Sequence, residues 1–175
     1  MSLLQPKASS CRPETDAWQK VRLTKTAIHN TDVLSEAYNY PKKASFVRGM
    51  RVEVGNASMV FISGTASVDE HGKSVHAGDF AAQTRRTFMN IKALLESEGA
   101  DWHDVVRTTC YLTDFRNYDE FNHIRTAYYD REGLDPLPAS TCIEARLCRP
   151  ELLVEIEAIA MTPSDRTRQC IPGSA

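Results

Sequence analysis

Apolar and polar residues alternate regularly only between residues 44 and 163, and the alternation there changes period along the chain. Residues 45–54 follow a period of two, which predicts a strand with one apolar face. Gly55 and Asn56 supply a turn, and a short apolar run over residues 59–63 predicts a second strand that ends at Gly64. The two strands are therefore expected to form a hairpin.

Two later segments change to the helical period. Asp79 is a suitable N-cap for the first helix, which Gly99 is expected to terminate, and Asn117 is a suitable cap for the second. The predicted class is α/β (α+β), a single domain with a mixed sheet and two helices packed on one face. The remaining strands are predicted at residues 106–112, 139–145 and 153–161.

The last predicted strand has two chemically different faces. Small and apolar side chains lie on one face, whereas Glu155 and Glu157 share the other. Because two helices can cover only one side of a sheet, the side with the carboxylates must meet water or another subunit. Apolar residues from other strands share that side, so self-association is the simplest cover. Functional clefts are therefore expected between subunits. The apolar face consists of Val154, Ile156, Ala158 and Ala160.

Composition narrows the classes of partner. The chain has 175 residues, a formal net charge of −2 and a sequence pI near 6.2. It therefore lacks the basic field that holds a polyanion, and a small anionic metabolite is a better candidate than nucleic acid. No apolar run approaches the ~20 residues that span a bilayer, and the N-terminus lacks a secretory core. We expect a cytoplasmic protein with no membrane partner.

Polar segments flank the regular region. Residues 1–43 are predicted to be an extension, partly ordered or disordered, with Trp18 and residues 38–41 as possible anchors. Residues 44–163 are the predicted domain, and residues 164–175 a polar tail. The five cysteines show no paired spacing, and the five histidines show no metal-binding or triad pattern. No disulfide framework, metal or cofactor is expected.

Several segments together resemble one protein family in order and spacing. The resemblance is to the Rid, or YjgF-type, family of reactive-intermediate deaminases, also called endoribonuclease L-PSP-like proteins. It implies a chorismate-mutase-like fold, a homotrimer with a central barrel, and cofactor-free hydrolysis of 2-imino and 2-enamine acids in clefts between subunits. The segments are VFISGTASVDEHGK (60–73), the run 79–115, YDEFNHIRTAYY (118–129), PASTCIEARL (138–147) and LLVEIEAIAM (152–161).

This chain departs from the family at two implied site positions. Ser140 stands where active relatives carry an arginine that holds the substrate carboxylate, and Phe46 stands where they carry a tyrosine. Arg146 is six residues from Ser140, about 20 Å along a strand, and is judged too far to substitute. Arg48, two residues after Phe46, is our candidate for the anion contact. The alternative is that Arg48 is a solvated or ion-paired surface arginine.

The resemblance also implies the other site residues. Glu155 matches the glutamate that positions the attacking water, although an interface carboxylate is an alternative. Glu157 aligns with a position that is more often structural. A substrate-binding role is expected for Ser63, Gly64, Asn122, Thr141 and Cys142, with turn formation, helix exposure and simple packing as their alternatives.

Three functions remain open on the sequence alone. The leading hypothesis is a deaminase that adds water to a small anionic imine, enamine or aminomuconate-like acid. Similarity of SFVRGM (45–50), FISGTAS (61–67) and CRPELLVEIEA (148–158) to the C-terminal part of chorismatases offers chorismate hydrolysis as an alternative. The third is a non-catalytic trimer that binds a metabolite or another protein. Ribonuclease activity gains no support from an acidic chain.

Overall fold

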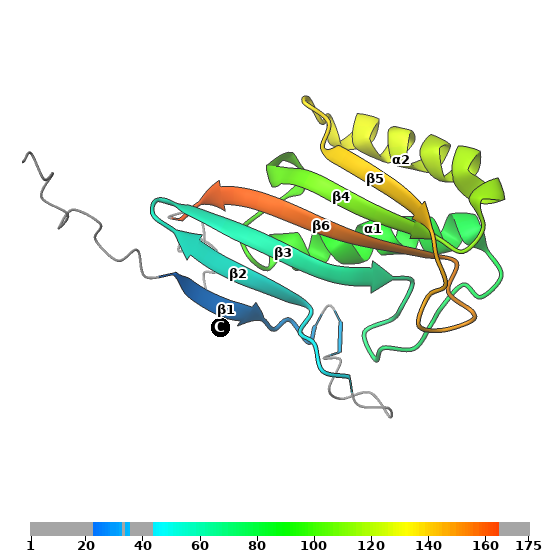
Figure 1. Ribbon diagram of the computed structural model, residues 1–175, viewed down its shortest axis with the longest axis horizontal. Coiled ribbons are helices and arrows are strands. Elements are labelled where there is room, and N and C mark those ends of the chain that lie inside the picture. The colour runs from blue at the N-terminus through cyan, green and yellow to red at the C-terminus, as the bar shows by residue number, and fades with distance from the viewer. Residues whose placement is uncertain (1–22, 33, 36–43, 165–175) are drawn as a thin grey trace, which may run out of the picture.

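The computed structural model describes residues 23–32, 34–35 and 44–164. Within these ranges the chain forms one six-stranded sheet in the order β1-β2-β3-β6-β4-β5 (Figure 1). Strands β4 and β5 pair in parallel, and the other neighbouring strands pair antiparallel. The predicted mixed sheet with two helices is confirmed. The strands are β1 (Thr24–Ile28), β2 (Gly49–Val54), β3 (Ala57–Ala66), β4 (Val105–Leu112), β5 (Ala139–Glu144) and β6 (Val154–Pro163); the helices are α1 (Phe80–Glu96) and α2 (Tyr118–Glu132), and the short 3₁₀ turns are η2 (Trp102–Asp104) and η3 (Phe115–Asn117).

Local sequence signals explain most of these boundaries. The β2–β3 turn holds Gly55 at φ 62°, a conformation that glycine adopts without strain. Asp79 caps α1 by accepting a hydrogen bond from the Ala82 amide, as predicted. Asn117 occupies the cap position of α2, but its side chain makes no capping hydrogen bond within the described structure. That helix ends at Gly133, which adopts the left-handed conformation.

Strand β3 continues past the predicted end at Gly64. Its pairing with β6 shifts by one residue between Ile62 and Thr65, where a bulge that contains Ser63 and Gly64 lets the strand run on to Ala66. A glycine in a strand-like segment can mark either the end of the strand or a bulge. The sequence predicted an end at Gly64, and the structure has a bulge there. The bulge has a functional consequence, because it lies beside the two carboxylates of β6.

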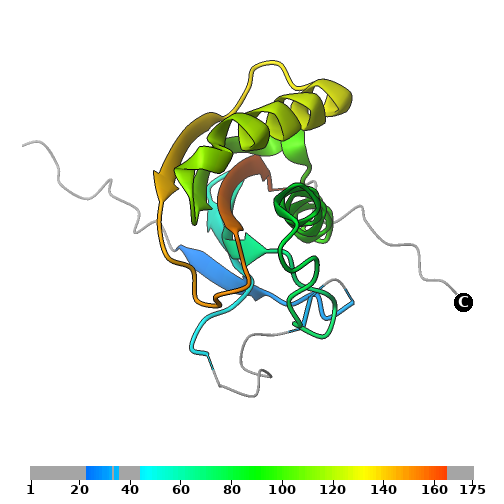
Figure 2. The ribbon, with the colours of Figure 1, turned by 90° about the vertical axis from the view of Figure 1, so that its right-hand side faces the viewer.

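Both helices lie on the same side of the sheet, and the main core fills the space between them and the strands (Figure 2). Phe88 of α1 is fully buried at the centre of an aromatic group with Trp102, Phe121, Tyr128 and Tyr129. The four apolar residues of β6, from Val154 to Ala160, are buried beneath the helices as predicted. The opposite side of the sheet has no helix over it in the described ranges, and it carries the exposed side chains of Val54, Ile143 and Met161.

Strand β1 comes from the segment that the sequence assigned to an extension. It pairs with β2, and Ile28 at its end is buried in the core. A Cβ on Gly49, which pairs with Ile28, would lie 2.7 Å from Ile28 Cδ1 and 2.7 Å from the Phe61 carbonyl oxygen. Glycine at this position therefore lets three strands approach closely. The predicted anchors, Trp18 and residues 38–41, and the tail from residue 165 onward lie outside the described residues.

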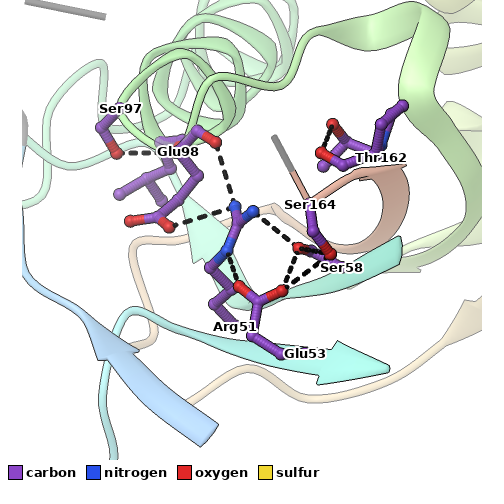
Figure 3. A network of polar contacts seen from close by, with 9 residues as sticks. Arg51, Glu53, Ser58, Ser97, Glu98, Thr162 and Ser164 are labelled. Carbon is purple, nitrogen blue, oxygen red and sulfur yellow. Dashed lines mark hydrogen bonds and ion pairs between the residues drawn. The ribbon is translucent and has the colours of Figure 1, made fainter. Parts of the chain in front are cut away.

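A polar network is buried between β2, β3 and the end of α1 (Figure 3). The Arg51 guanidinium donates to Glu53 Oε1 at 2.7 Å, to Ser58 Oγ at 2.7 Å and to the Glu98 carbonyl oxygen at 3.1 Å. Ser58 and Ser164 donate to the other oxygen of Glu53. The network ties the sheet to the helix layer at the end of the molecule where α1 stops.

No helix in the described ranges is long and apolar enough to cross a bilayer.

Candidate functional site

A cavity of about 540 Å³ opens on the side of the sheet that the helices leave uncovered. It is built from the bulge of β3, the paired strands β4 and β6, the loop after β5 and the segment before β2. Tyr111 contributes from β4, and Phe46 contributes from the segment before β2. The lining residues are Phe46, Ser63, Gly64, Tyr111, Ala145, Arg146, Leu147, Cys148, Glu155 and Glu157.

The two carboxylates on β6 are held in different ways. Burial raises the pKa of Glu155, and the nearby Glu157 carboxylate raises it further. Glu157 accepts a hydrogen bond from the Tyr111 hydroxyl at 3.2 Å. Burial and the adjacent glutamates raise the pKa of Tyr111, so this hydroxyl stays a donor near neutral pH. A carboxyl with a raised pKa beside a second, hydrogen-bonded carboxyl group is suited to proton transfer.

Glycine at position 64 makes room for the Glu155 carboxyl group. A Cβ built on Gly64 would lie 2.1 Å from Glu155 Oε1 and 2.9 Å from its Cδ, so no side chain fits there while Glu155 keeps its position. Because the bulge brings the β3 backbone against this carboxyl, the predicted association of Gly64 with the site has a steric cause. The alternative reading, a simple turn requirement, does not account for this contact.

Replacing Gly64 with alanine should therefore displace the Glu155 carboxyl while leaving the fold intact. The clashing atoms belong to the flexible end of a side chain, so we expect little change in the unfolding temperature. If Glu155 is catalytic, kcat should fall about tenfold or more, because a displacement of about 1 Å can cost up to ~10²-fold. Circular dichroism melting and steady-state kinetics on the same samples would separate the two effects. Unchanged kcat in the folded variant would contradict a catalytic Glu155.

Ser63 and Arg48 have other partners in the structure. The Ser63 hydroxyl lines the cavity but donates to the Val47 carbonyl oxygen at 2.8 Å. Arg48 does not line the cavity; its guanidinium donates to the Ser35 carbonyl oxygen at 2.9 and 2.7 Å, and the side chain is buried. It also lies 5.8 Å from the Phe46 ring centre. A solvated surface arginine does not match this buried arrangement, and Arg48 does not reach the cavity as the predicted anion contact would.

Arg146 corrects a second expectation. Strand β5 ends at Glu144, and the chain beyond it continues as a loop. The loop brings Arg146 into the lining of the cavity that contains Glu155. The distance argument measured from Ser140 along an unbroken strand, so it did not anticipate Arg146 in the lining of the cavity beside Glu155.

The other predicted site residues form a separate group at the edge of the sheet. Ser140 pairs with Thr108, whose side chain is buried on the side that the helices cover. Ser140 Oγ accepts hydrogen bonds from Thr108 Oγ1 and from Arg125 Nη1, both at 3.1 Å. Asn122 Oδ1 accepts from Arg125 Nη2 at 2.6 Å. Arg125 was missed by the sequence analysis, since it is one of several charged residues on α2 and only the fold brings it to Ser140.

Thr141 and Cys142 flank Ser140 without joining its hydrogen bonds. Thr141 accepts a hydrogen bond from Arg107 at 3.0 Å. Cys142 is partly buried, and burial raises its pKa, as it does for the adjacent Cys110. These thiols are thus poor nucleophiles at neutral pH. Within the described ranges no group of three or more His, Cys, Asp or Glu side chains could hold a metal ion.

Comparisons with known proteins place the chain in a family. The family model described as Endoribonuclease L-PSP matches residues 39–162. A RutC family protein of Pyrococcus abyssi is 34% identical over 109 residues, which cover 62% of this chain and 81% of the relative. The 3-aminoacrylate deaminase RutC of Acinetobacter baylyi is 34% identical over 103 residues, covering 59% of this chain and 79% of that protein.

Solved structures agree with the sequence matches. The YjgF gene product of E. coli matches with a TM-score of 0.63 and 28% identity, over 77% of this chain and 97% of the other. E. coli TdcF with bound serine matches with a TM-score of 0.64 and 25% identity, over 78% and 98%. The sequence match covers more than half of the chain, and the fold agrees over nearly the whole of each neighbour. The chain therefore belongs to the endoribonuclease L-PSP, or Rid/YjgF-type, family.

Proposed function

We propose that this protein is a hydrolytic deaminase that converts a small anionic imine or enamine into an oxo acid and ammonia. The observation that carries the proposal is the position of the Glu155 carboxyl group. It lies in the cavity, fits against Gly64, and has a raised pKa. A relative named 3-aminoacrylate deaminase, 34% identical to this chain, supports the reaction class.

The chemistry requires only water and a proton carrier. Ionised Glu155 takes a proton from water as the new C–O bond forms at the imine carbon, and the imine nitrogen takes a proton from the solvent. The resulting carbinolamine then loses ammonia: its hydroxyl group gives up a proton to the solvent as the carbonyl forms, the C–N bond breaks, and Glu155 returns its proton to the leaving nitrogen. A raised pKa suits both steps, because a base whose pKa lies nearer the working pH is stronger and its conjugate acid is still available. An enamine enters the same route after tautomerising to the imine.

We further propose that the site lies at an interface between copies of this chain, in a homotrimer. The uncovered side of the sheet supports this, because exposed and partly buried apolar side chains surround the cavity there. A closed, symmetric assembly is the usual way to cover such a face. Assembly would also remove water from around Glu155, which strengthens the electrostatic effects on its pKa.

Imine hydrolysis by the native protein tests the proposal. 2-Imino acids generated in the assay by an amino-acid oxidase should disappear faster with the protein present, and 2-oxo acid and ammonia should appear in equal amounts. Heat-denatured protein is the control for uncatalysed hydrolysis. No acceleration across acids of different side-chain size would reject the deaminase proposal. Consumption of chorismate in the same preparation would instead favour the chorismate hydrolysis suggested by the sequence.

A further inference from the structure

Asn122, Arg125 and Ser140 form a group at the outer edge of the sheet, beside β5, and they present hydrogen-bond donors to the outside. Asn122 Oδ1 is already bonded to Arg125, so its amide N–H groups point elsewhere. Ser140 Oγ accepts from both Thr108 and Arg125, so its own O–H is a donor for a ligand or for Cys110 Sγ, which lies 4.0 Å away. Arg125 has five N–H donors and makes two hydrogen bonds to oxygen within the described residues. The arrangement thus offers guanidinium, amide and hydroxyl donors at one place.

Arg125 is held in position but lacks an acidic partner. Its guanidinium lies 5.2 Å from the Phe121 ring centre, and two hydrogen bonds fix its orientation. No carboxylate forms an ion pair with it in the part of the chain that the structure describes, whereas Arg116 and Arg131 each have one. A preorganised arginine without a carboxylate partner is suited to bind the carboxylate of a ligand.

Arg125 and Glu155 lie on different sides of the same sheet. Ser140, which Arg125 contacts, shares the helix-covered side with Thr108, and α2 runs alongside β5 there (Figure 1). Glu155 faces the cavity on the uncovered side. One small substrate cannot touch both groups of the same chain through the sheet. It can touch both only if the outer edge of one copy meets the cavity of another.

We infer that Arg125 binds the carboxylate of the substrate, and that it does so in the cavity of a neighbouring copy whose Glu155 performs the chemistry. The inference rests on the proposed deaminase function for the identity of the substrate. The inference assigns the contact with the substrate carboxylate to a residue of α2, because the serine at position 140 of β5 carries no positive charge. Arg146, which lines the Glu155 cavity itself, is the competing residue; it is exposed and makes no hydrogen bond within the described residues, so it is less preorganised.

Arg125→Gln should raise KM for an anionic imino acid by roughly ten- to a hundredfold, with a smaller change in kcat, since charge-assisted hydrogen bonds to the carboxylate are lost. Arg125→Lys, which keeps the charge without the planar fork, should lie between native and Arg125→Gln. Arg131→Gln is the matched control, because Arg131 lies on the same helix and also stacks on a ring, that of Tyr128; its KM should stay native. Unchanged KM in Arg125→Gln, or a loss confined to Arg146→Gln, would overturn the inference.

Mixed assemblies test the contribution of a second copy. Co-expressed Arg125→Gln and Glu155→Gln chains, purified together through two tags so that only mixed trimers remain, should recover about a third of the native kcat/KM, because one of the three interfaces of every mixed trimer then has both intact groups. Each variant alone should stay far below that value. Activity of the mixture equal to the average of the two variants would refute a shared site.

Binding of a stable product separates failure of the inference from failure of the deaminase proposal. Pyruvate, a 2-oxo acid that cannot be deaminated, should bind the native protein and bind Arg125→Gln at least tenfold more weakly by isothermal titration calorimetry. If the native protein hydrolyses no imine but shows this difference, the anion site stands and the proposed reaction falls. If both proteins bind pyruvate equally, Arg125 is not the anion site.

Discussion

Glu155→Gln should lower kcat for imine hydrolysis by about 10²–10⁴-fold, the range expected when a general acid–base group is lost. Glutamine keeps the shape of the side chain and its fit against Gly64 but cannot take a proton from water. KM should change less than kcat, because the proposed carboxylate contact lies on Arg125. Steady-state kinetics at several pH values would measure both. Activity within threefold of native would exclude Glu155 as the catalytic group.

The same substitution should stabilise the fold at neutral pH. Burial and Glu157 raise the pKa of Glu155 above its unfolded value. Its protonated form is therefore favoured in the folded state, and the stability it gives is lost as pH rises through the folded pKa. Glutamine avoids that loss, so the melting temperature of Glu155→Gln should exceed that of native protein at pH 7 and match it more closely at low pH.

Glu157→Gln is the matched control for Glu155. Removing the neighbouring negative charge should lower the pKa of Glu155, which Glu157 now raises. The acid limb of the pH–kcat profile should then move to lower pH, while activity at neutral pH is largely kept. A shift to higher pH would contradict the assignment of that limb to Glu155.

Arg51→Met should destabilise the protein by about 2–4 kcal/mol, the second large effect we expect. Methionine fills most of the space but leaves the partners of the guanidinium without their donor. These partners include Ser58, which is fully buried, and Glu98, whose Oε2 lies 3.7 Å from Arg51 Nη1 (Figure 3). The loss corresponds to a fall of roughly 5–15 °C in melting temperature. Urea unfolding at fixed protein concentration would measure it.

The destabilisation by Arg51→Met should depend on pH in a defined direction. Hydrogen bonds from Ser58 and Arg51 lower the pKa of Glu53, so the stability from that carboxylate is present above its unfolded pKa and is lost as pH falls through the folded pKa. Burial raises the pKa of Glu98, while Arg51 opposes the shift. The deficit of the variant should therefore be largest near pH 7 and shrink in acid. Arg116→Met, in an exposed pair with Asp114, should leave the midpoint unchanged.

Much of the fold could be predicted from local patterns, because strand burial and helix capping depend on residues that lie close together in the sequence. Alternation along β6 predicted which side chains are buried, and Asp79 marked the start of α1. The sequence pattern missed β1, since its exposed edge carries mostly polar residues and only Ile28 enters the core. It also placed the end of β3 at Gly64, because a glycine in a strand has the same local signature at a bulge as at an end.

The sequence by itself determined that one face of β6 is apolar and the other carries Glu155 and Glu157, since side chains on a strand alternate between faces. Only the tertiary structure decided which side chains and backbone segments contact Glu155 and the other candidate site residues. It brought Gly64 against Glu155, placed Arg146 in the same cavity, and set Arg125 of α2 against Ser140 of β5. These contacts join residues that are distant in the chain, and they depend on a bulge, a loop and a helix position that follow from packing of the whole domain. Local periodicity carries no information about such contacts.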